Sequence, residues 1–521
     1  MIIMKKNIYI LFIVLTMIIS TQSCFNLDEE VFSLVTAESF GQTEDEVDAI
    51  IGPVYNTLKQ YFERWVYISE CSGDMAIVPT RLGGDWFDGG QYRDIHMHTW
   101  TSNTGALRNA WNIASTSIST CNLVYETVNS LEILTDENRA SALAEIRGIR
   151  AFWVYSMMDA WGNIPLAVDF KDTELPATKT RQEVFDYIIS ELNDIKDILR
   201  SDVNSSNYGK FTKGAAYALL AKMYLNADAW GVNSGVTDNW QEVIDACDMV
   251  MSLGYQLEDN WKNNFITNND GSKEAILASC QSYSDAGSYR FRIHSRTLHY
   301  KDNIALGASF TASNGICAQE GYCRLFDEED KRLGGSFLMG EMVDPSTGEV
   351  IMTAHNRPLI HTIEVTQIPG SQYEGSIWGQ VNQEDGYRCF KWEISRDIIS
   401  TMNNDVFLIR YADIYLMKAE ALVRKSIDNA TATNLVNTIR ERGFGNSSHN
   451  YSSVTLDDIA LERKLEFAWE LMNRQDLIRF GTFQDARYLK PSTTGQDYKN
   501  IFPIPQTALD ANSKLTQNPG Y

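Results

Sequence analysis

The sequence predicts a mainly helical protein in which repeated helix pairs carry a loop-rich lobe. Three observations lead to this prediction. Several segments repeat apolar residues with the spacing of an α-helix, and each is followed by a second amphipathic segment. A long stretch between about residues 257 and 404 lacks that spacing. The chain has 521 residues, of which 44% are hydrophobic and 11% aromatic, so it can bury a large core.

The clearest helical segment covers residues 208–227. Its apolar residues recur at positions i, i+3, i+4, i+7, i+8 and i+11, and they are Ala216, Leu219, Leu220, Met223, Tyr224 and Ala227. This spacing places them on one face of a helix. A row of alanines beside that face allows a neighbouring helix to approach closely. A second amphipathic segment follows at residues 240–253, and such helix pairs resemble tetratricopeptide repeats.

Further pairs are predicted on both sides of this one. Residues 408–425 show the same spacing and are followed by the amphipathic segment 432–442. Residues 143–162 pair with residues 180–199, and the first of these helices is apolar nearly all round, which predicts that it is buried. A fourth candidate begins at residue 111. The expected scaffold therefore contains about four helix pairs.

Two regions have little helical periodicity. Residues 257–404 are rich in Gly, Asn, Ser and Tyr, which predicts long loops and short strands carried by the helices. A second irregular insert covers residues 69–109. Within it, His96, His98 and Trp100 alternate in sequence, which predicts that they share one face of a strand.

The N-terminal residues read as an export signal of residues 1–23. Two lysines precede an apolar run too short to span a membrane, and small polar residues lead to Cys24. The position of Cys24 resembles the acceptor of a bacterial lipoprotein signal, which predicts its diacylation. The alternative is that Cys24 is simply the first cysteine after ordinary cleavage. The acids that follow resemble a tag for the outer leaflet of the outer membrane.

Charge and cysteine content restrict the partners of this chain. The formal net charge is -23, so phosphate backbones and acidic polysaccharides are repelled and neutral ligands are favoured. Nucleic acid is therefore excluded as a partner. Apart from Cys24 the cysteines are expected to be mostly buried thiols, because no two have CxxC spacing. A disulfide between Cys317 and Cys323 remains an open alternative.

Several longer motifs match a known family. The chain contains NLDEEVFSLVTAESFGQTEDEVDAIIGPVYNTL after Cys24, then RGIRAFWVYSMMDAWGNIPLA, TKGAAYALLAKMYL and LIRYADIYLMKAEAL. It ends with IALERKLEFAWELMNRQDLIRFGTF and IFPIPQTALDANSKLTQNPGY. In these blocks the chain resembles the SusD/RagB family of outer-membrane nutrient-binding lipoproteins. Gln475 departs from the pattern, since an aromatic or apolar residue is expected there.

The resemblance implies an organisation and a function. It implies an N-terminal region at residues 24–256 with helix pairs and the glycan-site insert, and a C-terminal region at residues 257–521 with the lobe and the final helices. Family members are not enzymes. They capture oligosaccharides, or peptides in some branches, and they cover a SusC-like TonB-dependent transporter that imports the ligand. The chain is thus expected to be a lipid-anchored glycan-binding protein that faces the outside of the cell.

The composition of residues 70–103 suits a sugar-binding surface. Sugars present apolar C–H faces and pairs of hydroxyls, which flat aromatic rings and planar polar side chains bind. This insert supplies both kinds of side chain, and it resembles the glycan site of the starch-binding family member. The candidate glycan-binding residues are Asp74, Arg81, Trp86, Trp100 and Asn103, with Tyr289 in the second lobe. The alternative is a glycine-rich turn with the aromatic rings packed beneath it.

Two other functions are alternatives to glycan binding. The chain has no GxSxG elbow, Walker loop or HExxH motif, so no catalytic residue is predicted. His96 and His98 have no third ligand at zinc spacing, so no metal is predicted, and no other cofactor is predicted either. Its many carboxylates still leave a surface glycoside hydrolase as an alternative. Another alternative is a repeat scaffold that binds peptides or proteins.

Overall fold

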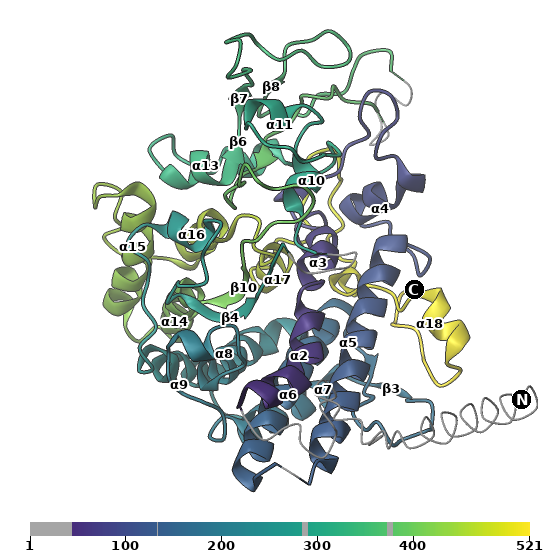
Figure 1. Ribbon diagram of the computed structural model, residues 1–521, viewed down its shortest axis with the longest axis vertical. Coiled ribbons are helices and arrows are strands. Elements are labelled where there is room, and N and C mark those ends of the chain that lie inside the picture. The colour runs from purple at the N-terminus through teal and green to yellow at the C-terminus, as the bar shows by residue number, and fades with distance from the viewer. Residues whose placement is uncertain (1–43, 133, 284–289, 372–378) are drawn as a thin grey trace, which may run out of the picture.

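The computed structural model describes residues 44–132, 134–283, 290–371 and 379–521. The signal at residues 1–23, the acceptor Cys24 and the candidate Tyr289 lie outside these ranges. The predicted fold class is confirmed, because helices form the body of the protein and the strands are few and short (Figure 1).

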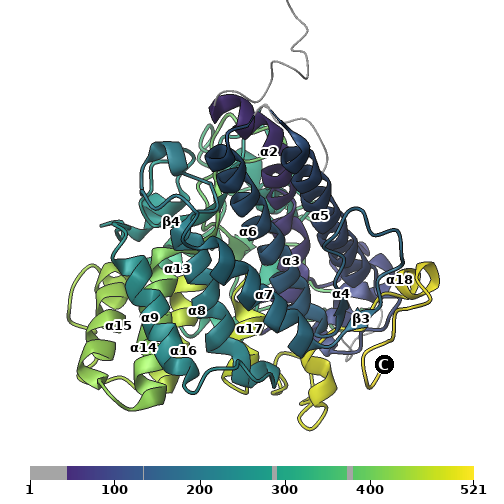
Figure 2. The same cartoon turned by 90° about the horizontal axis from the view of Figure 1, so that it is seen from below.

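A row of seven helices forms this body, and each helix packs on the next (Figure 2). The members of the row are α5 (Gly105–Ser130), α6 (Asp136–Trp161), α7 (Arg181–Ile195), α8 (Lys213–Trp230), α9 (Asn239–Met251), α14 (Tyr411–Lys425) and α15 (Asn429–Phe444). Helices α2 (Glu44–Leu58) and α3 (Tyr61–Ser69) pack against α5, outside the row. The arrangement is that of a tetratricopeptide-like scaffold.

Local sequence signals begin several of these helices. Thr180 and Glu183 form a capping box at the start of α7, and Thr455 and Asp458 form another at the start of α16 (Leu456–Phe467). The apolar face predicted for α8 is buried, with Leu220 only 3% exposed. The alanine row is also buried, as expected for close packing of neighbouring helices.

Helix α6 is the centre of the core, as its sequence predicts. Its side chains Ile146, Ile149, Phe152, Trp153 and Met157 are all buried. The ring of Trp153 meets Tyr61 and Trp65 of α3 edge to face, with centroids 5.6 and 5.7 Å apart. Aromatic pairs of this geometry stabilise a core beyond the area they bury. Helix α3 is therefore fixed in orientation, and the insert that follows it starts from a rigid point.

The loop-rich lobe is inserted between α9 and α14, which pack directly on each other. Its ordered elements are short: β4 (Ala275–Ser279), α10 (Ile293–Thr297), α11 (Asp302–Ala305), β5 (Cys317–Ala318), α12 (Glu320–Cys323), α13 (Lys331–Ser336), β6 (Phe337–Leu338), β7 (Gly340–Glu341), β8 (Ile360–His361), β9 (Arg388–Cys389) and β10 (Val406–Arg410). The described strands pair two by two and antiparallel, as β1 (Ala76–Ile77) with β5, β4 with β10, β6 with β9, and β7 with β8. This confirms the prediction of long loops and short strands.

The remaining elements connect or follow the helices of the row. They are η1 (Asp88–Gly90), α4 (Gln91–Met97), the pair β2 (Ile164–Pro165) and β3 (Thr178–Lys179), η2 (Ser205–Asn207), η3 (Trp261–Phe265), α17 (Asn473–Arg479), η4 (Asp497–Asn500) and α18 (Gln506–Ala511). Among the described residues, no helix combines the length and the apolar character needed to cross a membrane.

Three local predictions are corrected. The run with His96, His98 and Trp100 is not a strand, because residues 91–97 form α4, which ends where His98 adopts φ +55°. A short alternation of polar and apolar residues fits either periodicity, and the left-handed residue at the helix end decides here. Residues 408–410 belong to β10, so α14 begins at Tyr411. Helix α8 begins at Lys213, later than predicted.

The seven cysteines that the structure describes are free thiols. Cys317 and Cys323, for which a disulfide was left open, are both buried and unlinked. Burial also raises the pKa of Cys71 well above its usual range and that of Cys121 to about 12. Six of the seven are therefore inert core residues, as expected, and Cys280 is the exposed one.

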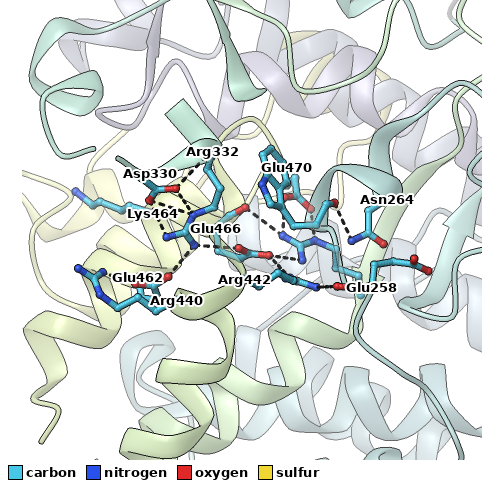
Figure 3. A network of polar contacts seen from close by, with 12 residues as sticks. Glu258, Asn264, Asp330, Arg332, Arg440, Arg442, Glu462, Lys464, Glu466 and Glu470 are labelled. Atoms are coloured by element: carbon cyan, nitrogen blue, oxygen red, sulfur yellow. Dashed lines mark hydrogen bonds and ion pairs between the residues drawn. The ribbon is translucent and has the colours of Figure 1, made fainter. Parts of the chain in front are cut away.

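A buried network of ion pairs joins the lobe to the C-terminal helices (Figure 3). Its centre is Glu466 of α16, which accepts hydrogen bonds from Arg332 of α13 at 3.0 Å, Arg410 of β10 at 2.7 Å and Arg442 of α15 at 2.6 Å. Glu466 and Arg332 are fully buried. Burial alone would raise the pKa of Glu466, but the three guanidinium groups outweigh it and hold the pKa well below its usual range.

We predict that Glu466→Gln destabilises the protein by about 3–5 kcal/mol at neutral pH, because it leaves buried arginines without their counter-charge. A depressed pKa in the folded state stabilises the fold above the carboxyl's unfolded pKa of about 4.3, and this contribution is lost as pH falls toward the folded pKa. Urea unfolding should therefore show a gap between wild type and variant that narrows below about pH 4.

The matched control is Glu349→Gln, which changes an exposed carboxylate in the lobe and should leave stability within about 0.5 kcal/mol of wild type. If Glu466→Gln behaves like this control, the network does not hold the lobe.

Candidate functional site

The insert after α3 is pinned to the lobe by Arg81, which is fully buried. Its guanidinium donates to the carbonyl oxygens of Asp385 at 2.7 Å, Asn314 at 3.1 Å and Gly315 at 3.2 Å. The backbone of the same segment pairs with residue 381, since the Leu82 N–H donates to the Val381 carbonyl at 2.8 Å. Arg81 therefore organises the backbone beneath the site, and its donors are used by the protein itself.

The loop that follows Arg81 presents Trp86 against the lobe. Trp86 has φ +64°, a conformation that non-glycine residues rarely adopt. The indole Nε1 donates to the Ser313 carbonyl at 2.5 Å. The ring packs over Gly315, where a Cβ would lie 2.3 Å from a ring carbon, so only glycine allows this approach. The contacts with residues 313–315 thus compensate the backbone strain and fix the ring.

Tyr92 and Tyr300 extend this aromatic surface. The ring of Tyr92 lies 5.7 Å from that of Trp86 and 4.9 Å from that of Tyr67, which is buried beneath it. Burial raises the pKa of Tyr92. The hydroxyl of Tyr300 donates to Asp85 in the same loop as Trp86, which joins the insert to the lobe. Burial and this bond together raise the pKa of Tyr300, so its hydroxyl stays protonated at neutral pH.

The turn that carries Tyr300 is held from below by a buried pair of polar side chains, Asp302 and His361. Asp302 accepts from the His299 N–H at 2.6 Å and contacts His361 Nε2 at 2.9 Å. Burial would raise the pKa of Asp302, but His361 and then Arg388 lower it overall. Both Asp302 and His361 are nearly inaccessible to solvent. They position the turn and do not face a ligand.

We call the resulting surface the aromatic patch, defined by Asp85, Trp86, Phe87, Tyr92 and Tyr300. Phe87 is 39% exposed, and Trp86, Tyr92 and Tyr300 are half-buried. Ring faces beside a carboxylate and phenol hydroxyls offer both apolar contact and hydrogen bonds, which is the chemistry that sugars need. In the described residues, no three His, Cys, Asp or Glu side chains are grouped so that they could hold a metal ion.

The structure does not bring all the predicted candidates together. Arg81 and Trp86 share the 313–315 segment, but Arg81 is structural. Asp74 lies against α16, where Lys464 donates to it at 2.5 Å. Asn103 is exposed in the turn before α5. Tyr289 lies outside the described residues. Of the five candidates that the structure describes, only Trp86 belongs to the aromatic patch.

Trp100 lies in the core, contrary to its predicted place on an exposed platform. It is 4% exposed, and its Nε1 donates to the Tyr521 hydroxyl at 2.6 Å. Its ring packs edge to face on Phe502, with centroids 4.7 Å apart. The physical reason is the helix α4, whose end turns the chain toward the C-terminal residues. A sequence pattern could not have shown this contact, because its partners are some 400 residues away.

His96 of α4 and His98, which directly follows the helix, are also internal. The Nε2 atoms of His96 and His98 contact the carbonyl oxygens of Tyr488 at 2.6 Å and Ser72 at 2.9 Å. Burial lowers the pKa of His96 to about 4 and that of His98 to about 2. Both are therefore neutral at physiological pH. His96 anchors the insert to the C-terminal segment through Tyr488, and the ring of His98 packs against that of Phe483, with centroids 4.4 Å apart.

The groove expected in a peptide-binding repeat scaffold is filled by the chain itself. Arg479 of α17 donates to Glu420 of α14 at 2.8 Å and to Asn226 of α8 at 3.0 Å. Gln475, the departure from the family pattern, exchanges hydrogen bonds with Tyr155 of α6 and accepts one from Asn226. A polar residue is thus accommodated there by polar partners. This packing favours a ligand site in the lobe over one between the helices.

Comparison with known proteins gives two family matches. A family model described as "SusD family" matches residues 255–521, and one described as "Starch-binding associating with outer membrane" matches residues 42–225. The starch-binding protein SusD of Bacteroides thetaiotaomicron is 26% identical over 434 residues, covering 76% of this chain and 75% of that protein.

Solved structures share the fold. A laminarin-binding SusD-like protein superposes with a TM-score of 0.71 at 21% identity, covering 92% of this chain and 100% of that one. Surface glycan-binding protein A from Bacteroides thetaiotaomicron, solved with laminarihexaose, gives a TM-score of 0.70 at 18% identity, covering 91% of this chain and 99% of that one.

We predict that Trp100→Ala lowers the free energy of unfolding by about 3–5 kcal/mol, because it removes a buried ring and leaves the Tyr521 hydroxyl without its donor. Phe87→Ala is the matched control, since this ring is 39% exposed. Denaturant unfolding of both variants checks the assignment. A Trp100→Ala protein as stable as the Phe87→Ala protein would mean that Trp100 is exposed.

Proposed function

Because this chain belongs to the SusD family, we propose that it captures glycan at the cell surface and delivers it to a SusC-like TonB-dependent transporter. The observation that carries the glycan part is the aromatic patch, whose Trp86 and Tyr300 are fixed by hydrogen bonds from behind while their rings remain partly accessible. Rings fixed before binding lose little conformational entropy when a sugar stacks on them. The relatives named for binding starch and laminarin support the same ligand class.

The remaining parts of the proposal concern location and mechanism. We propose that Cys24 carries the lipid anchor, that the mature chain begins at Cys24, and that the anchor holds the protein at the outer membrane, facing outward. The acidic balance of the chain supports a neutral glycan over a charged one. The protein acts as a binding protein and not as a hydrolase, and a reducing-end assay on soluble glycans tests this point directly.

We predict that Trp86→Ala weakens glycan binding by about 1–3 kcal/mol, which is roughly 5- to 150-fold in Kd, because the stacking surface is lost. Affinity electrophoresis with starch and laminarin gels, followed by calorimetry on the retained glycan, measures the effect. Melting curves are recorded in parallel, so that binding is expressed per folded molecule.

Two variants complete this experiment. Phe170→Ala removes a ring that is 52% exposed on the helical body, and it should bind like wild type. Trp86→Phe keeps a ring but loses the bond to Ser313, and it should retain part of the affinity. Unchanged binding by folded Trp86→Ala would place the glycan site elsewhere.

A second prediction concerns the anchor. Cys24→Ala should leave a folded protein that no longer partitions with membranes, because acyl chains supply the durable attachment. Fractionation is done in cells that lack the partner transporter, so that protein contacts cannot retain the variant. Continued recovery of Cys24→Ala in the outer-membrane fraction of such cells would contradict lipidation at this residue.

A further inference from the structure

A hollow of about 380 Å³ is lined by residues of α2 and lies apart from the aromatic patch. Figure 1 shows α2 within the helical body and α11, which follows Tyr300, in the lobe near the top of the view. Helix α2 forms one wall, residues 208–210 form another, and the end of β4 closes it. The polar and aromatic lining includes Asp48, Tyr55, Asn56, Tyr208, Lys210 and Cys280. This volume falls in the range of small-ligand sites, roughly 300–1,000 Å³.

Two smaller hollows continue the first one in both directions. One of about 130 Å³ shares Tyr208 as a wall and continues along residues 202–208. The other, of about 270 Å³, shares Asp48 and Ile51 and reaches Glu145 of α6. The 380 and 270 Å³ hollows are both lined by Asp48 and Ile51, so they lie side by side along α2, and the 130 Å³ hollow adjoins the first at Tyr208. We call the three hollows together the groove. A groove of this kind suits an extended ligand better than a single compact one.

The two tyrosines of the groove are held by their hydroxyls. Tyr208 donates to Asp405 at 2.8 Å, and Tyr55 donates to Glu145 at 2.6 Å while it accepts from the Phe211 N–H at 2.9 Å. Because each hydroxyl is engaged by the protein, the part of each side chain that remains for a ligand is the ring. Fixed rings lining a polar groove are suited to stacking against sugar C–H faces.

The charged side chains that line the 380 Å³ hollow are Asp48, Lys59 and Lys210, and Asp405 lies near Lys59, so carboxylates and lysines are balanced around it. Lys210 pairs with Asp48 at 2.7 Å, and both remain partly accessible at 16% and 37% exposure. A paired lysine and aspartate offer a donor and an acceptor side by side with little net charge, which matches the hydroxyl pairs of a sugar. Asn56 adds an exposed planar amide on the same helix. A phosphate or a carboxylate ligand would meet Asp48 as a repulsive neighbour.

We propose that this groove is a second glycan-binding site, which takes a neutral oligosaccharide independently of the aromatic patch. Two separate sites on one chain would hold a long polysaccharide more tightly than either site alone, because binding at the second becomes intramolecular. The inference goes beyond the proposed function, which requires one site only.

Cys280 provides a reporter inside the groove. It is the exposed member of the seven described thiols, and it lines the 380 Å³ hollow. Burial, and then the nearby Asp405, raise the pKa of its thiol to about 12, so it labels more slowly than a free cysteine. A ligand in the groove should shield it from a thiol reagent such as dithiodipyridine.

The experiment measures the labelling rate of Cys280, identified by peptide mass spectrometry, in the Cys24→Ala protein with and without maltoheptaose or laminarihexaose. A glycan that occupies nine-tenths of the sites should slow labelling about tenfold. The same protection is expected when Trp86→Ala removes the aromatic patch. Asn56→Trp places a bulky ring in the hollow from an exposed position, and it should abolish the protection. Ala49→Trp, exposed on the same helix outside the lining, should not.

Each outcome decides the proposal. Any of three results overturns the second site. Neither glycan slows the labelling of Cys280, the protection disappears in Trp86→Ala, or the protection persists in Asn56→Trp. Affinity electrophoresis of the same proteins reports the aromatic patch separately. Glycan retention without protection of Cys280 therefore rejects the groove and leaves the proposed function standing.

Discussion

The buried cluster around Glu466 is the interaction on which the rest of the structure depends. One carboxylate in α16 is bonded to arginines from α13, β10 and α15, elements that are far apart in sequence. Arg410 also bonds Glu470 at 2.6 Å, and Arg332 bonds Glu462 at 2.7 Å, so the charges are neutralised in place. Buried charges that are fully paired tolerate little displacement, because any gap leaves a charge without solvent or partner. The lobe is therefore held rigidly on the helical row.

That rigidity sets the geometry of the aromatic patch. The patch is assembled from two segments, one following α3 and the other within the lobe, and neither forms it alone. Arg81 links them through carbonyl oxygens of residues 314, 315 and 385, and Tyr300 links them again through Asp85. Because the lobe is fixed by the network and α3 by the aromatic core, the strained backbone at Trp86 is held in one conformation. Binding then requires little reorganisation of the protein.

The helical body carries different features on different sides. Near the lobe, α17 packs between α8 and α14. Elsewhere α2 lies outside the row, and hollows lie between it and the segment that joins α7 to α8 and between it and α6. Glycan-binding chemistry at both places would suit a protein whose ligand is a polymer longer than the molecule's own sites. The scaffold thus separates two surfaces while keeping their distance fixed.

The sequence by itself determined the helical scaffold, the position of the lobe and the family. The apolar periodicity of residues such as Leu220 and the terminal motifs are local features, which can be read from each segment without its tertiary partners. It also placed Trp86 among the candidate glycan-binding residues. Only the tertiary structure decided which residues meet it. Arg81 and Trp100 have the residue types of a sugar site, yet their partners, the carbonyls of the lobe and Tyr521, come from hundreds of residues away and bury them. Burial depends on such long-range contacts, which no local pattern encodes.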